Sequence, residues 1–221
     1  PVPEAHGTSI AGILVARNQM KGIAPEARVV SVRAFSSAGA GRSPEATTLS
    51  VIKGLEWAFI GGTRLYNLSF TGPRDPLLEQ LLERAEAQGA VFVAAAGNAG
   101  PGAPAAYPAA YKTVVAVTAV DANDRVYARA SRGPYVAIAA PGVDILAPTL
   151  ASGYGMSSGT SMAAAHVTGA IALVMEKRPD LKPAQIREVL LRAVRPGDAA
   201  SARDIGAGIL DAAKLIEVVA R

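Results

Sequence analysis

Short runs of apolar, β-branched residues alternate with longer segments of helical periodicity along the 221-residue chain. Such runs, when near-continuous, are typical of strands buried on both faces. The predicted strands are residues 28–35, 63–70, 90–95, 113–120 and, more briefly, 135–139. Helices are predicted between the first three strands, over residues 44–59 with Ser43 as N-cap, and over residues 76–88, which Gly89 closes. This alternation predicts an α/β fold, with a mostly parallel sheet covered by helices on both faces.

Three further helices are predicted in the last third of the chain, over residues 161–177, 183–193 and 211–220. The first of them is apolar on all sides, so we expect it to run through the core. In sheets of this kind, ligands bind beyond the carboxyl ends of the strands. We therefore expect the loops after Phe70, after Ala96 and before Ser161 to converge there.

Composition and charge narrow the range of functions. Half of the residues are hydrophobic and 18% are charged, which indicates one compact globular domain over residues 1–221. The net charge is +4, but the Lys and Arg residues are scattered, and no basic stripe predicts a nucleic-acid partner. The most apolar segment, residues 162–175, is too short to span a membrane. The absence of cysteine excludes thiolate metal sites and disulfides.

One serine stands where a glycine-rich turn enters an alanine-rich helix, in Gly159-Thr-Ser161-Met-Ala. Serine at such a junction commonly caps the helix or occupies its first turn, and this stretch alone favours that interpretation. The same position also suits a nucleophile, because free N–H groups and the positive end of the helix dipole would meet a developing negative charge there.

The chain holds two histidines that could act as a base for this serine. His166 follows Ser161 by five residues on the same helix, which places it about 140° away around the axis. We therefore interpret His166 as structural, which leaves His6, at the opening of another small-residue helix. Asn98 follows Gly97 at the end of a buried strand; it fits a plain turn, but its amide could also donate a hydrogen bond to an oxyanion.

Taken together, these segments resemble the subtilisin-like serine peptidases, the subtilases. His6-Gly-Thr is similar to the histidine motif of that family, Gly159-Thr-Ser161-Met-Ala to its nucleophile motif, and Ala96-Gly97-Asn98 to its oxyanion motif. Residues 67–72, 140–142 and 206–212 are similar to further landmarks. The resemblance extends over essentially the whole chain.

The resemblance implies a serine endopeptidase acting on polypeptides. Ser161 would be the nucleophile, His6 the base, and Asn98 the side-chain donor of the oxyanion hole. Because Ala99 replaces an acidic residue that some members carry, we expect an uncharged pocket that prefers an apolar residue before the scissile bond. The expected substrate-binding residues are Ser69, Phe70, Thr71, Gly72, Gly41, Ala95, Ala96, Gly97 and Ala106.

The catalytic aspartate of the family lies on a first strand, upstream of the histidine motif, and only five residues precede His6 here. We therefore expect an N-terminally incomplete catalytic domain, missing a strand between residues 28–35 and 63–70 and the segment or propeptide that carries it. Each unpaired buried backbone group would cost about 1–3 kcal/mol. Residues 1–221 alone are accordingly not expected to form a stable, active enzyme.

No cofactor or metal is predicted. Residues 18–22 form a loop too short and too poor in oxygen ligands for the calcium loop of the family. We expect a secreted or extracytoplasmic protein, although the first residues are not a signal peptide. The main alternative function is a non-catalytic, peptide-binding or scaffold protein of the same fold. A different serine hydrolase is disfavoured, because the serine motif is not the G-x-S-x-G elbow.

Overall fold

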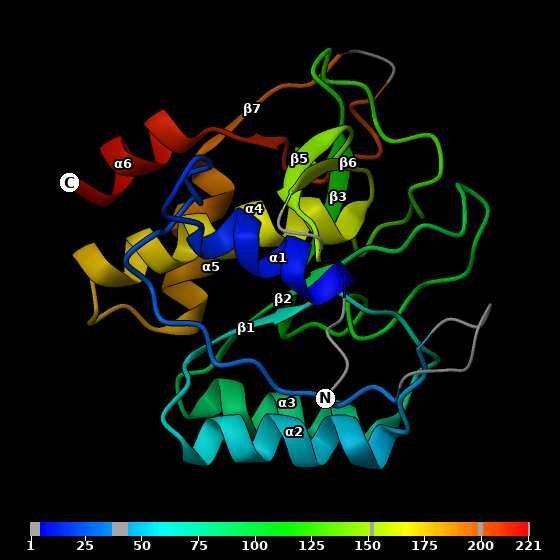
Figure 1. The fold of residues 1–221 in the computed structure, drawn as a ribbon, viewed down its shortest axis with the longest axis vertical. Helices are drawn as coiled ribbons and strands as arrows, with labels where there is room; N and C mark the ends of the chain where they lie inside the picture. The colour runs from blue at the N-terminus through cyan, green and yellow to red at the C-terminus, as the bar shows by residue number, and fades with distance from the viewer. Residues whose placement is uncertain (1–4, 37–43, 151–152, 199–200, 221) are drawn as a thin grey trace.

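The computed structural model describes residues 5–36, 44–150, 153–198 and 201–220 (Figure 1). Its helices are α1 (Ala5–Val15), α2 (Thr48–Ile60), α3 (Pro76–Ala87), α4 (Thr160–Lys177), α5 (Pro183–Arg192) and α6 (Ala212–Ala220). Its strands are β1 (Leu65–Leu68), β2 (Val91–Ala95), β3 (Val114–Val120), β4 (Ile138–Pro141), β5 (Ile145–Pro148), β6 (Tyr154–Ser157), β7 (Val194–Arg195) and β8 (Ile209–Leu210). In this part of the chain, no helix is both long and apolar enough to cross a membrane.

The main sheet has the strand order β1-β2-β3-β4-β8-β7, and all neighbours except β8 and β7 are parallel. This confirms the predicted α/β class and four of the five predicted strands. The β5–β6 hairpin and the two-residue strands β7 and β8 were not predicted. The hairpin was not predicted because its two strands are only partly buried and only four residues long.

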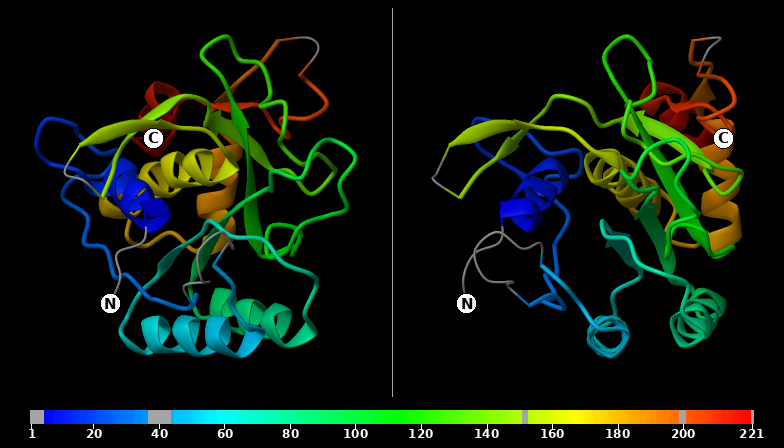
Figure 2. Two further views of the ribbon diagram at one scale, coloured as in Figure 1. Left: turned by 45° about the vertical axis from the view of Figure 1, so that its right-hand side comes forward. Right: turned by 90° about the vertical axis from the view of Figure 1, so that its right-hand side faces the viewer.

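The sheet is covered on both faces, as the unbroken apolar runs require. Alternate residues of β2 and β3, such as Val93 and Val117, pack beneath α4, α5 and α6. The residues between them, such as Phe92 and Ala116, pack against α2 and α3. Figures 1 and 2 show α2 and α3 side by side on one side of the sheet, with α1 and α4 on the other.

Helix α4 runs through the core, as its apolar sequence predicted, and most of its residues from Thr160 to Val174 are buried. It lies between the sheet and α1, and at Gly169 the loop after α1 also approaches it closely. A Cβ atom added at Gly169 would lie 2.6 Å from the side chain of Ile23. Larger side chains in this helix would therefore push its neighbours apart.

Two of the predicted helix starts can be compared with the structure. Helix α2 begins four residues later than expected, with Thr47 as N-cap accepting a hydrogen bond from Ser50 N (3.2 Å). The predicted cap Ser43 lies outside the described residues. Helix α3 begins at Pro76 as predicted, because Asp75 Oδ1 accepts from Leu77 N (2.9 Å).

The strand predicted over residues 28–35 was wrong: in the described part of the chain this segment pairs with no strand. Its sequence has the apolar pattern of a buried strand, yet Val29, Val30 and Val32 are exposed by 42%, 43% and 38%. A strand exists only where a neighbouring strand completes its hydrogen bonds. The segment has strand-like side chains without such a neighbour.

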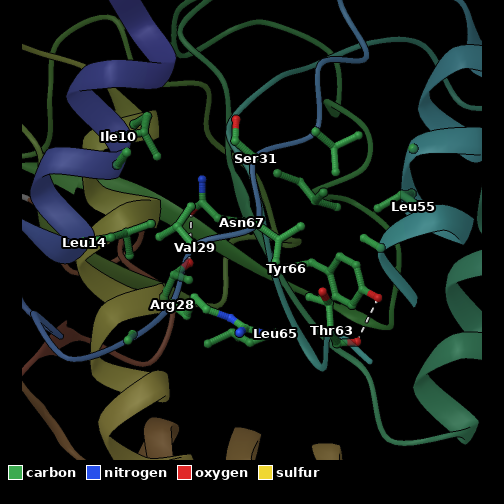
Figure 3. A pocket seen from close by; sticks show the side chains of 18 of the residues that line it. Ile10, Leu14, Arg28, Val29, Ser31, Leu55, Thr63, Leu65, Tyr66 and Asn67 are labelled. Atoms are coloured by element: carbon green, nitrogen blue, oxygen red, sulfur yellow. Dashed lines mark hydrogen bonds between the residues drawn. The ribbon is translucent and has the colours of Figure 1, made fainter. Parts of the chain in front are cut away.

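A cavity of about 600 Å³ separates this segment from β1, the edge strand of the sheet. Figure 3 shows Val29 and Ser31 beside Asn67 and Tyr66 of β1. Ile10 and Leu14 of α1 line one side and Leu55 of α2 lines the other. We call this cavity the slot; its walls are mostly apolar, and the edge of β1 that faces it pairs with no strand in the described ranges.

His166 lies half-buried on α4, and its Nδ1 is 2.9 Å from the carbonyl oxygen of Met162. Burial lowers the pKa of His166 below its ordinary value of 6.5, and the hydrogen bond to Met162 opposes this only in part. The folded protein therefore favours the neutral imidazole.

Acidification should destabilise the fold through His166. Because its pKa is lower in the folded state, the unfolded state binds the proton more readily, and stability is lost as the pH falls through about 6.5 towards the folded pKa. The variant His166→Asn should lose less free energy of unfolding between about pH 7.5 and pH 5.5 than the wild type. Urea denaturation at both pH values measures this, and an equal loss in the two proteins would contradict it.

Candidate active site

Three loops meet where the parallel strands end, as their order in the sequence predicted. The loop after β1 contacts the start of α4, since Ser69 Oγ donates to the carbonyl oxygen of Ser161 (3.3 Å). The loop after β2 contacts the same helix end, where Thr160 N donates to Asn98 Oδ1 (3.0 Å). The predicted residues Ser69, Asn98 and Ser161 are thus brought to one edge of the sheet.

The carboxamide of Asn98 is oriented by Thr160. The Thr160 hydroxyl lies 3.1 Å from Asn98 Oδ1, to which it donates, and accepts from Gly97 N (3.1 Å). With its oxygen engaged twice, the amide directs its NH₂ group elsewhere. A Cβ at Gly159 would lie 3.2 Å from Asn98 Nδ2, so this NH₂ group lies against the turn that leads into α4.

Ser161 lies in the first turn of its helix and is not the N-cap. The N-cap is Gly159, without a side-chain cap, and Ser161 is the second residue of α4. The Ser161 hydroxyl donates to the carbonyl oxygen of Ser69 over a long 3.4 Å. Among the described residues, no acceptor is paired with the Ser161 N–H group. The start of α4 therefore offers a weakly held hydroxyl and an unpaired N–H group side by side.

His6 is the second residue of α1, and its side chain is exposed. One turn further along α1, Ile10 packs in a cluster with Met162, the residue that follows Ser161. The starts of the two helices are linked through this cluster. A proton-transfer contact between His6 and Ser161 remains a prediction, since the hydroxyl of Ser161 points to Ser69 in this structure.

The predicted walls of the substrate pocket are tied to the rest of the fold. Gly72 N donates to the carbonyl oxygen of Tyr107 (2.7 Å), and Tyr107 N donates back to Gly72 (3.1 Å). At the other wall, a Cβ at Gly97 would lie 3.4 Å from that of Ala106. Phe70 packs against Phe35, with ring centroids 5.2 Å apart.

The other predicted pocket residues are buried or exposed, and one of them lies outside the described residues. Ala95 and Ala96 are buried, whereas Thr71 is exposed. Gly41 lies outside the described residues.

Sequence reasoning missed three residues of this region. The hydroxyl of Thr160 was part of the quoted nucleophile motif, but its hydrogen bonds were not foreseen. Tyr135 donates its hydroxyl proton to the carbonyl oxygen of Ala96 (2.8 Å), and burial is the main cause that raises the pKa of this phenol. Tyr107 holds the other wall. A tyrosine far away in the sequence gives no signal of such a contact.

The aspartates considered in the sequence are engaged in loops and caps. Asp75 caps α3, Asp121 accepts from Asn123 N (2.8 Å), and Asp144 Oδ1 accepts from the Ser158 hydroxyl (3.2 Å). Asp124 forms an ion pair with Arg195, with Nη2 2.7 Å from Oδ1, which lowers the pKa of Asp124. Within the described ranges, no three His, Cys, Asp or Glu side chains gather as metal ligands.

Comparison with known proteins places this geometry in a family. The pattern described as the Subtilase family matches residues 3–208. Subtilisin DY of Bacillus licheniformis is 36% identical over 192 residues, which covers 84% of this chain and 68% of that protein. Minor extracellular protease Epr of Bacillus subtilis is 33% identical over 210 residues, covering 93% of this chain but 32% of Epr.

Solved structures agree with this assignment. The prenylagaramide maturation protease PagA superposes with a TM-score of 0.86 at 28% identity, over 97% of this chain and 82% of that chain. The match to the family pattern spans nearly the whole chain. The chain therefore belongs to the subtilase family of serine peptidases.

Proposed function

We propose that this chain is the catalytic part of a serine endopeptidase in which Ser161 is the nucleophile. The observation that carries the proposal is the start of α4, where the unpaired N–H of Ser161 and the oriented amide of Asn98 lie together. Two donors fixed in advance at one point are what a developing oxyanion requires. Neither donor arrangement is needed to stabilise the helix, whose first N–H group is already paired with Asn98.

The reaction follows from these positions. Ser161 Oγ attacks the carbonyl carbon of the scissile peptide bond while His6 takes its proton, and the oxyanion accepts hydrogen bonds from Ser161 N–H and Asn98 Nδ2. When the C–N bond breaks, His6 returns the proton to the leaving amine, and an acyl-enzyme remains. Water then attacks the ester through the same steps, releasing the acid and restoring Ser161.

The substrate is proposed to be a polypeptide with an apolar residue before the scissile bond. Ala95, Ala96, Gly97 and Ala106 are small and uncharged, and Ala95 and Ala96 are buried. A charged side chain would lose its hydration in such a pocket without gaining a partner. We also propose an extracytoplasmic location, by analogy with the relative that is named an extracellular protease.

The slot supports a further part of this proposal, namely an additional β-strand between residues 28–35 and β1. Residues 28–35 on one side of the slot and β1 on the other both have the side chains of strands, and a strand between them would pair with each. The residues of α1 and α2 that line the slot are mostly apolar. A strand of about six residues spans about 20 Å and would pair with the open edge of β1. We propose that its end carries the carboxylate that orients His6.

Removing the nucleophile or the oxyanion donor tests the proposed chemistry. When a six-residue strand that fills the slot is fused before Pro1, a fluorophosphonate should label the wild-type protein but not Ser161→Ala. Asn98→Ala should lower kcat about 100- to 1,000-fold, a range that comes from a subtilase itself. Asn123→Ala is the matched control and should keep the wild-type rate, because Asn123 is exposed in the turn after β3 and its side chain contacts no predicted site residue in the described structure. Binding of peptides without any labelling would support the scaffold alternative instead.

A panel of fluorogenic peptides tests the pocket. Peptides with Leu, Phe or Met before the scissile bond should have a kcat/KM about 100-fold higher than peptides with Lys or Arg, because the pocket offers no countercharge. The exposed Ala99 allows a check by gain of function. Ala99→Glu should improve cleavage after Lys and Arg several-fold, whereas Ala99→Gln should not. Wild-type protein that prefers basic residues would contradict the proposed pocket.

Filling the slot tests the missing strand. A strand Val-Ala-Val-Val-Val-Asp, joined before Pro1 by about 12 Gly/Ser residues that reach about 20 Å, should raise the melting temperature by at least about 5 °C. The same fusion with two of its valines replaced by proline is the control, because proline cannot complete the hydrogen bonds of a strand. Equal melting temperatures of the two fusions would refute strand binding in the slot. Ala172→Phe, which narrows the slot, should reduce the gain.

A further inference from the structure

A polar pair lies in the otherwise mostly apolar wall of the slot and has no part in the chemistry described above. Thr168 of α4 is only 5% exposed, and its hydroxyl shares its single proton between two acceptors, one of which is Asn67 Oδ1 of β1 at 3.0 Å. The same hydroxyl oxygen lies 2.8 Å from the carbonyl oxygen of Ala164, one turn earlier in the helix. Figure 3 shows Asn67 on β1 at the wall of the slot, across from Val29.

The pair is the far end of a chain of hydrogen bonds that reaches Ser161. Asn67 Nδ2 donates to Ser69 Oγ (2.8 Å), and Ser69 Oγ donates to the carbonyl oxygen of Ser161 (3.3 Å). Thr168 follows Ser161 by seven residues, which is two turns, so both face β1 from the same side of α4. Helix α4 is thus bonded to β1 and its following loop at two points, one of them Ser161 itself.

Packing alone does not account for a threonine at position 168. Its neighbours toward the active site, Ala163, Ala164 and Ala165, are fully buried alanines, which favour a helix and allow close approach. Threonine is a poorer helix former, and its buried hydroxyl costs free energy unless it is hydrogen-bonded. The carbonyl oxygen of Ala164 is one such partner within the helix, and Asn67 Oδ1 is a second one on a different element of the fold.

We propose that Thr168 and Asn67 are positioning residues for Ser161, and this rests on the proposed role of Ser161 as nucleophile. The two side chains fix the position of α4 along β1. Ser69 accepts from Asn67 and donates to the carbonyl oxygen of Ser161, so it fixes the backbone of Ser161 relative to the same strand. Neither residue touches the reacting atoms. Small displacements of a nucleophile reduce the rate of attack strongly while leaving substrate binding largely intact.

The variant Thr168→Val tests this, because valine keeps the shape and removes the hydroxyl. It leaves Asn67 Oδ1 without its donor, so kcat for peptide hydrolysis should fall about 3- to 10-fold with KM unchanged within about two-fold. Thr168→Ser restores the hydroxyl and should restore kcat. Thr118→Val is the matched control, because Thr118 on β3 is fully buried and its hydroxyl has no partner in the described structure. This control should keep the wild-type kcat.

A second measurement does not depend on catalysis. Hydrogen exchange followed by mass spectrometry should show faster exchange in a peptide covering residues 155–165 of Thr168→Val, by about 3- to 10-fold, and no change in Thr118→Val. All kcat measurements use the protein fused to the Val-Ala-Val-Val-Val-Asp strand; if that wild-type fusion hydrolyses no substrate, the proposed function fails and the exchange data alone decide the positioning role. Unchanged kcat and unchanged exchange in Thr168→Val, or failure of Thr168→Ser to restore either, would overturn the proposal.

Discussion

The position of one helix end relative to two strand ends determines the rest of this structure. The start of α4 is fixed against the loops after β1 and β2 by hydrogen bonds that involve Ser69, Asn98 and Thr160. The Thr160 hydroxyl is central, since it accepts from Gly97 N and donates to Asn98 Oδ1. This one hydroxyl therefore fixes both the backbone of Gly97 and the side chain of Asn98 against the start of α4.

This arrangement explains the concentration of small residues around Ser161. Gly142 accepts a hydrogen bond from Gly159 N over 2.7 Å, so the chain after β4 lies directly against the turn before α4. A Cβ at Gly142 would lie 2.9 Å from the carbonyl oxygen of Gly159 and 3.0 Å from the Cβ of Ala163. Side chains here would separate the turn from the sheet and displace the serine, so the glycines and alanines are a geometric requirement of the site.

Much of this could be predicted from the sequence where the signal is local. The runs that became β2 and β3 are apolar throughout because both faces are covered, and Pro76 and Asp75 mark the start of α3 by their own chemistry. The prediction that the loops after β2 and before α4 converge also holds, since Asn98 is bonded to Thr160, the residue before Ser161. The failures are non-local. Residues 28–35 have the pattern of a strand without a partner, and Tyr135 reaches Ala96 from 39 residues away. No local pattern encodes either the missing partner or that contact.

Strand β1 connects the two proposals physically. One edge of β1 pairs with β2, while the other faces the slot, and Asn67 lies between that slot and the loop that bonds to Ser161. A strand held on one edge only is less firmly fixed in its position than one that is paired on both sides. A strand in the slot would therefore stabilise more than the sheet, since it would also fix Asn67 and, through Ser69, the backbone of Ser161. Completion of the sheet by such a strand and placement of the proposed nucleophile would then depend on the same four residues of β1.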